Sequence, residues 1–262
     1  VPIVRVALGE FHGLALTALG EVLAWGLDQG PEVNIPSEAL RISGLPERAS
    51  LNQPVPRAVE LPHRVAEIFT GAYHSAAITE EGLLWTWGSN DHGQLGHGSG
   101  VPPLFRPKLV EALHQRGEAP QQRVVAASLG GFHSCAIVEG GAVFAWGANS
   151  KGQCGHGDAA IVDRPLRVEF ASPALRCLAV SCGGLFTYFK MCDGSARPQF
   201  YACGLGKEGC LGFGQPCKRM SRPRPLPSPT KAGAAGCEGM CWTHIEAGMA
   251  HVAGLAAAVA ST

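Results

Sequence analysis

The sequence predicts an all-β fold in which small sheets of short strands are arranged radially, as in a β-propeller. The first observation is a phrase that recurs along the chain: residues 71–98 read GAYHSAAITEEGLLWTWGSNDHGQLGHG and residues 130–157 read GGFHSCAIVEGGAVFAWGANSKGQCGHG. The second is composition, because 35 glycines and 19 prolines in 262 residues suit many short strands joined by tight turns. A fixed repeat of this kind dictates the architecture of the whole chain.

Each copy of the phrase predicts a β-hairpin followed by a glycine-rich loop. A stretch such as HSAAIT has strand character, a turn containing Gly follows it, and a second strand ends in Trp-Gly. An apolar stretch such as 64–71 precedes the hairpin, and Pro-rich segments return the chain to the next copy. A unit built only of strands cannot bury both faces alone, but units placed radially against one another can, which is the arrangement of a propeller.

The same phrase is eroded at 9–26 and 183–214, and its first half returns at 248–258. Aligned on the G-x-x-H position, the anchors are His12, His74, His133, Phe186 and His251, at intervals of 62, 59, 53 and 65 residues. We therefore predict a single propeller region over 1–262, divided into a half repeat at 1–19 and repeats at 20–79, 80–139, 140–191 and 192–262. Both ends carry the first half of a unit, so they do not complement each other. This predicts about four blades plus a half unit in an open arc, or a fragment of a larger ring, in preference to a closed ring of four or five blades.

Residues that recur in every copy are interpreted as blade architecture. We expect the Trp residues to pack between blades and each His to form a hydrogen bond inside its own blade. The glycines of the loop supply positive φ angles, and its Asn residues bond locally. The predicted structural signature comprises His12, His74, His133, His251, Trp25, Trp87, Trp146, Gly88, Gly147, Asn90, Asn149, Gly93, Gln94, Gly96, Gly152, Gln153 and Gly155.

Bulk charge and hydropathy exclude several classes of protein. The formal net charge is zero, which disfavours direct binding of nucleic acid. The apolar stretch 252–260 is shorter than the roughly 20 residues of a membrane span. No targeting segment is visible, and ten cysteines without a disulfide framework suit a reducing compartment, so we expect a nuclear or cytoplasmic protein.

Few motifs suggest chemistry. Gly204-x-Gly206-x-x-Gly209 formally matches a dinucleotide fingerprint, but Gly204 aligns with Gly88 of Trp-Gly and no helical pattern follows. Cys237 and Cys241 are the nearest approach to a paired zinc motif, and buried reduced thiols are the alternative interpretation of the cysteines. We therefore predict no cofactor, no catalytic residues and no enzyme.

One basic run is candidate partner-binding surface. Its side chains are Lys218, Arg219, Arg222 and Arg224, and the neighbouring prolines favour an extended, exposed loop. A solvated linker is the alternative interpretation. The other variable segments, where specific function would lie, are 27–61, 99–121, 158–175 and 215–240.

The two-part motif G-x-x-H-S-x-A-I-T and W-G-x-N-x-x-G-Q-L-G-x-G resembles the repeat of the regulator of chromosome condensation. Residues 71–98 and 130–157 match nearly letter for letter, and the resemblance covers most of the chain. It implies blades of a propeller that typically has seven, for which this chain is too short. It also implies three candidate functions: a non-catalytic scaffold for protein partners, an exchange factor or other regulator of a small GTPase, and an ultraviolet photoreceptor. The photoreceptor depends on Trp in G-W-R-H-T repeats, and the corresponding positions here read GEFH, GAYH and GGFH.

Overall fold

A computed structural model describes residues 1–27, 52–114, 122–195, 197–213, 217–228 and 240–258 of the chain. Within these ranges the chain forms 18 strands and two short 3-10 helices, Glu111–Leu113 and Lys207–Gly209. The strands make four four-stranded sheets and one two-stranded hairpin, and every pairing is antiparallel. The expected all-β fold is confirmed.

Each sheet is built from strands that follow one another in the chain. The first contains β1 (Ile3–Leu8), β2 (His12–Thr17), β3 (Val22–Leu27) and β4 (Asn52–Val59), and the second contains β5 (Val65–Thr70), β6 (His74–Thr79), β7 (Leu84–Gly88) and β8 (Leu104–Leu109). The third contains β9 (Val124–Leu129), β10 (His133–Val138), β11 (Val143–Ala148) and β12 (Ile161–Arg167), and the fourth contains β13 (Arg176–Cys182), β14 (Phe186–Cys192), β15 (Gln199–Leu205) and β16 (Arg219–Pro225). The hairpin pairs β17 (Met240–Ala247) with β18 (Val252–Ala258).

The sheets are offset from the predicted sequence repeats. Repeat 80–139, for example, takes β7 and β8 from the second sheet and β9 and β10 from the third. The repeat boundaries themselves stay a prediction. The offset means that the chain crosses an interface between two sheets within every full repeat.

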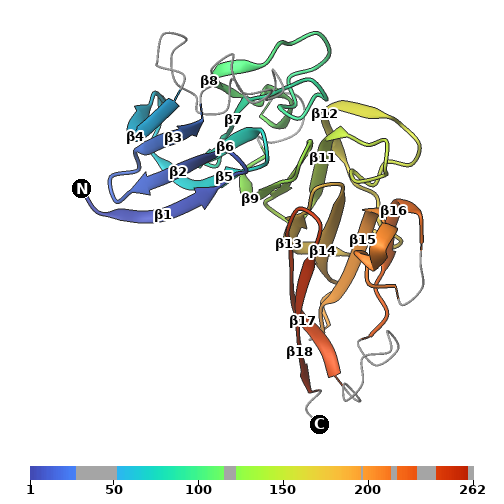
Figure 1. Cartoon of the computed structure of the whole chain (residues 1–262). Coiled ribbons are helices and arrows are strands. Elements are labelled where there is room, and N and C mark those ends of the chain that lie inside the picture. Colours follow the sequence, from blue (N-terminus) through green and yellow to red (C-terminus); the bar gives the residue numbers. More distant parts are fainter. Residues whose placement is uncertain (28–51, 115–121, 196, 214–216, 229–239, 259–262) are drawn as a thin grey trace.

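The sheets follow one another around an open arc, with β1 and the β17–β18 hairpin at opposite ends (Figure 1). The hydrophobic core is divided accordingly into four clusters, one between each consecutive pair. The second strand of each of the first three sheets is buried along its whole length. In the second and third sheets, each face of this strand packs on a different neighbouring sheet. Successive side chains of a strand point to opposite faces, so adjacent residues serve different interfaces.

Two Trp residues, Trp87 of β7 and Trp146 of β11, lie in these interfaces. Trp87 packs with Leu14 and Leu16 of the first sheet, and Trp146 packs with Ala76 and Leu84 of the second. Both indoles are buried, whereas Trp25 of the first sheet is half-buried. The Trp of one sheet therefore covers the sheet that precedes it.

The start of the arc exposes apolar side chains that are buried in the other sheets. Ile3 and Val6 of β1 are 46% and 53% exposed, whereas the equivalent Val65 and Ile68 of β5 are 3% and 2% exposed. The difference arises because β5 packs against a preceding sheet and β1 has none among the described residues. At the other end, Leu255 of β18 is 66% exposed.

The glycine of each Trp-Gly pair adopts a backbone conformation that other residues rarely accept. Gly88 and Gly147 have φ angles of 107° and 105°, and Gly204 in the fourth sheet has 110°, which agrees with its alignment to Gly88. A Cβ at Gly88 would lie 2.8 Å from the Tyr73 carbonyl oxygen. This close approach lets the second and third strands begin their pairing at His74 and Gly88.

Replacing Gly88 by Ala is expected to destabilise the fold by roughly 3 kcal/mol, through backbone strain and collision with Tyr73. Gly140 is the matched control, since it has a φ of 86° but no atom within 4 Å of the added Cβ. Gly140→Ala should therefore show only the backbone cost, about 1 kcal/mol. Urea unfolding of both variants measures the difference, and equal losses would contradict the steric argument.

Candidate interaction surface

A buried histidine joins each of the first three sheets to the next one. The side chain of the histidine that opens the second strand meets a hydroxyl on the second strand of the following sheet. The Nε2 to Oγ distances are 2.8 Å for His12–Ser75, His74–Ser134 and His133–Thr187. The expectation that each His bonds within its own blade is therefore wrong. Strand alternation explains the correction, because His74 and Ser75 are adjacent and must point toward opposite neighbours.

In two of these links, the hydroxyl donates a second hydrogen bond to a loop carbonyl of the preceding sheet, across the same interface. Ser134 Oγ donates to the Gln94 carbonyl oxygen at 2.8 Å, and Thr187 Oγ1 donates to the Gln153 carbonyl oxygen at 2.7 Å. Since each hydroxyl proton is used in this way, the hydroxyl accepts from the imidazole Nε2–H. His74 is therefore the neutral tautomer that carries its proton on Nε2. Burial lowers the pKa of His74 to about 3, assisted by the neighbouring His133 and His12, and burial alone lowers the pKa of His12 to about 3.

The glycine-rich loops present the carbonyls that complete these links. Asn90 donates to the Val101 carbonyl at 2.7 Å and accepts from the Leu95 amide at 3.0 Å, while the Gln94 side chain accepts from the His92 amide at 2.9 Å. The Gln94 carbonyl is then left to face the next sheet, where Trp146 Nε1 also donates to it at 2.8 Å. Asn149 and Gln153 hold the next loop in the same way.

The fourth interface replaces the polar link by an apolar contact. Phe186 takes the place of His, and Val252 takes the place of the hydroxyl residue on β18. Both belong to the apolar cluster between the fourth sheet and the hairpin. The loss of the donor thus coincides with the loss of its acceptor, as expected if the two residues form one unit.

The rings immediately before these histidines form a row across three sheets. Phe11 and Tyr73 stack with centroids 5.8 Å apart, and Tyr73 and Phe132 stack at 5.3 Å. His92 adds an edge contact to Phe132 at 4.9 Å. All three rings of the row are half-buried, and their positions hold Leu185 and Ala250 in the fourth sheet and the hairpin. The aromatic row, Phe11–Tyr73–Phe132, was not predicted from the sequence, because the ring type changes between copies and only the neighbouring His recurs unchanged.

The basic run lies on a strand and not in the expected loop. Lys218 precedes β16, the outer strand of the fourth sheet, which contains Arg219, Arg222 and Arg224, and all four side chains are exposed. Arg219 pairs with Asp158 at 2.9 Å. Arg222 is one of three Arg-Pro pairs at a spacing of 58 residues, with Arg106 and Arg164 on β8 and β12. Two of these, Arg164 and Arg222, lie against glycines of the preceding sheet's loop, Gly98 and Gly157. This recurrence, readable in the sequence, assigns Arg222 to the repeat.

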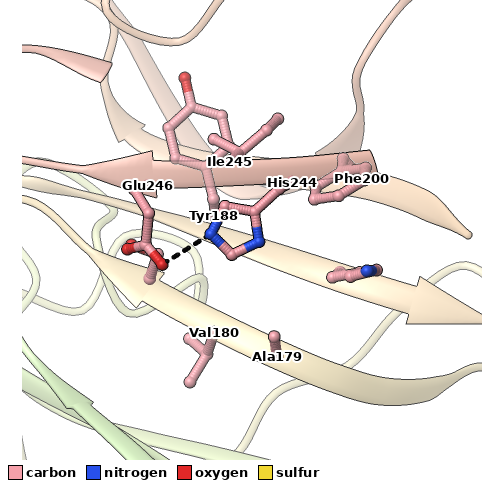
Figure 2. A pocket seen from close by; sticks show the side chains of 9 residues that line it. Ala179, Val180, Tyr188, Phe200, His244, Ile245 and Glu246 are labelled. Atoms are coloured by element: carbon pink, nitrogen blue, oxygen red, sulfur yellow. Dashed lines mark hydrogen bonds and ion pairs between the residues drawn. The ribbon is translucent and has the colours of Figure 1, made fainter. Parts of the chain in front are cut away.

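A small polar pocket lies between the fourth sheet and the hairpin (Figure 2). His244 Nε2 and Glu246 Oε1 are 3.0 Å apart, and Ser181 Oγ donates to the same carboxylate at 3.1 Å. Lys190 Nζ donates to the Thr243 carbonyl at 3.0 Å. The cavity is about 30 Å³, room for one or two water molecules but not for a larger ligand. Its hydrogen bonds instead hold the hairpin against the fourth sheet.

A larger hollow of about 400 Å³ lies beside Leu226, Trp242 and Val252. Gly212 also lines it, and the equivalent Gly96 in the second sheet contacts Trp146 of the third. The hollow therefore occupies the position that the third-strand Trp fills at an earlier interface.

The predicted zinc pair falls largely outside the structural description. Cys237 lies outside the described residues, and of Cys241 only the backbone, in β17, is described. Parts of the variable segments, residues 28–51, 115–121 and 229–239, also lie outside them. Within the described ranges, one group brings metal-ligand atoms together: His133, Cys135 and Cys182.

Comparison with known proteins identifies the repeat. A family model described as the regulator of chromosome condensation (RCC1) repeat matches residues 81–137 and 140–189, and a second model of the same description matches 3–29, 65–94 and 124–153. The chain belongs to the RCC1 repeat family. Among curated relatives it is 32% identical to human E3 ubiquitin-protein ligase HERC2 over 191 residues, 69% of this chain and 3% of that protein. It is 38% identical to the zebrafish (Danio rerio) Protein RCC2 homolog over 152 residues, 58% of this chain and 28% of that protein.

Solved structures of RCC1-type propellers share the fold. Human WBSCR16 superimposes with a TM-score of 0.74 at 22% identity, and Prp20p of Saccharomyces cerevisiae with a TM-score of 0.76 at 21% identity. The alignment covers 98% of this chain in both cases, but 58% and 56% of those proteins. The RCC1-repeat arc therefore spans little more than half of a solved propeller and less than a third of the curated relatives named above. Among the described residues, no helix has the length and apolar character needed to cross a bilayer.

A double-mutant cycle on His74 and Ser134 is expected to show strong coupling. Ser134→Val alone leaves the buried His74 Nε2–H without an acceptor, at a cost of about 2 kcal/mol. In the background of His74→Phe, which reproduces the Phe–Val pair of the fourth interface, the same change should cost at least about 1 kcal/mol less. Urea unfolding of the four proteins measures this coupling, and additive losses would show that the two side chains act independently.

Stability is expected to fall as the solution is acidified below about pH 6.5, the ordinary pKa of histidine. His12 and His74 stay neutral in the fold down to about pH 3, whereas in the unfolded chain they gain protons near pH 6.5. Protonation therefore favours the unfolded state, by about 1 kcal/mol per pH unit for each histidine between these limits. Urea midpoints at pH 7.5 and 5.0 measure the loss. His74→Phe should reduce it, because this variant has no imidazole to protonate at position 74.

Proposed function

We propose that the arc is a non-catalytic protein-binding module and that partners dock on the face that carries the aromatic row. The stacked, half-buried rings of Phe11, Tyr73 and Phe132 are the observation that carries this proposal. Aromatic side chains are enriched at the centres of protein interfaces, since they bury a large area at small cost in conformational entropy.

The rigidity beneath the row supports the same function. Each ring directly precedes a histidine that is hydrogen-bonded across a sheet interface at 2.8 Å. The ring positions are therefore set by the packing of two sheets at once, and little ordering is required when a partner binds. Loops on a rigid frame are where propellers and other scaffolds place their binding residues.

Regulation of a small GTPase is the second candidate. The solved structure of Prp20p, which shares the fold, is described together with its binding to Gsp1p and histones. A nucleotide-release assay with a panel of small GTPases separates the candidates. Accelerated release would assign the chain to this second function, and no acceleration would favour the scaffold. The ligase activities named for HERC2 and HERC5 belong to far longer proteins, of which the chain spans 3% and 20%.

Truncating the aromatic row is expected to weaken partner binding without unfolding the protein. Phe132→Ala, at the junction of Tyr73 and His92, should lower the affinity for a captured partner by at least about tenfold, as at an interface hot spot. Leu166→Ala on the outer strand β12 is the control, because Leu166 is also exposed, at 51%, but lies away from the row. Quantitative pull-down and titration measure both. Equal binding by the two variants would place the docking surface elsewhere.

A further inference from the structure

The interface between the third and fourth sheets holds more buried thiols than any other interface among the described residues. Five cysteines lie in its buried cluster: Cys135, Cys154, Cys177, Cys182 and Cys203. The interface between the second and third sheets holds Ala76, Leu95, Val124, Leu129 and Trp146 at the equivalent positions. The repeat therefore packs well without sulfur at any of these places, and blade architecture does not account for the thiols.

Three ligand groups converge within this cluster. His133, Cys135 and Cys182 each have a ligand atom within 4.8 Å of the others. His133 and Cys135 lie two residues apart on β10 and so share a face, and Cys182 ends β13 opposite them. The first two side chains are fully buried, and Cys182 is 7% exposed.

We propose that His133, Cys135 and Cys182 form a binding site for a soft d10 metal cation, Zn²⁺ or Cu⁺, that joins the third and fourth sheets. Thiolate and imidazole are the ligands that these ions prefer. In a tetrahedral zinc site with Zn–S bonds of about 2.3 Å, ligand atoms lie about 3.8 Å apart. Since the ligand atoms lie within 4.8 Å of one another, a contraction of at most about 1 Å is enough, and rotation of the side chains can supply it.

When the metal binds, it replaces the protons of the cysteine thiols. Each thiol loses its proton to solvent as its sulfur forms a bond to the metal, while the imidazole binds through a nitrogen lone pair and stays neutral. With Zn²⁺ the two thiolates give a site of zero net charge, which suits an apolar interface. With Cu⁺ the charge is −1, or zero if one thiol keeps its proton. Because the thiols release protons when they bind the metal, affinity should increase with pH.

The hydrogen-bond link at this interface shares His133. Nε2 of His133 lies 2.8 Å from Thr187 Oγ1, and Nδ1 is buried with no partner among the described residues. The same is true of Nδ1 in His12 and His74, so the histidine does not by itself mark the site. The sulfurs of Cys135 and Cys182 distinguish this interface from the two before it. At the same two positions, the earlier interfaces hold Leu14 with Thr70 and Ala76 with Leu129.

Metal content of the refolded chain tests the proposal. The full chain is reduced, stripped with a chelator and refolded without oxygen in Zn²⁺ or, separately, in Cu⁺, because burial of the site is expected to slow loading of the folded protein. With at least one of the two ions, we expect one bound metal per chain and a raised midpoint of thermal unfolding. With Co²⁺ as probe, thiolate-to-metal charge-transfer absorption should appear.

Variants taken from the chain's own repeats keep the test interpretable. Cys135→Ala and Cys182→Leu install the residues of the preceding interface and are expected to fold, but to lower metal occupancy at least tenfold. Cys154→Leu, a buried thiol of the same cluster outside the triad, should retain the metal and the absorption. Circular dichroism confirms folding of each.

Three results would overturn the proposal. The first is wild-type occupancy in both triad variants. The second is loss of the metal on replacing Cys237 and Cys241 by Ser, which would place the site there. The third is the absence of bound metal after refolding in either ion. If a Cys135–Cys182 disulfide then forms on treatment with peroxide, the pair is a redox couple.

Discussion

The hydrogen bond from a buried imidazole to a hydroxyl on the next sheet is the interaction on which this structure depends. It fixes the neutral tautomer of the histidine, orients the hydroxyl toward a loop carbonyl, and so ties the second strand and glycine-rich loop of one sheet to the second strand of the next. Buried polar groups are expensive when unpaired. A slip of one residue in either strand would point His74 and Ser134 away from each other. The links therefore specify the register between sheets, while the apolar clusters supply most of the burial.

The repeats act as internal controls for one another. Where Phe186 replaces His, Val252 replaces the hydroxyl residue, and an apolar contact takes the place of the histidine link. Where cysteines replace Ala, Leu, Val and Trp, the backbone geometry is retained. A change that keeps the architecture but alters the chemistry is informative about function, and the interface between the third and fourth sheets concentrates such changes.

The strands, their antiparallel order and the open arc could be predicted from the sequence, because the recurring phrase contains a hairpin and a glycine that requires positive φ, such as Gly88. The partner of each histidine could not. His74 lies 60 residues from Ser134, and only the alternation of side chains along two packed strands shows that they meet. The stacking of the aromatic row could not be predicted either. Phe11, Tyr73 and Phe132 differ in residue type, and their stacking depends on the angle between sheets. The structural role of Arg222 in the repeat could be predicted from the 58-residue spacing of the Arg-Pro pairs. Its basic neighbours instead suggested a partner-binding run.

All three histidine links run in the same direction, each from a sheet to the one after it. The sheets are therefore not interchangeable modules, although their backbones are alike. A sheet inserted after the third must offer a hydroxyl, and one inserted after the fourth must offer an aliphatic side chain against Phe186. Duplication or exchange of single sheets by recombination would break this order, whereas pairs that carry a matched donor and acceptor could be moved together. The unit of modularity in this fold is thus the interface between two sheets.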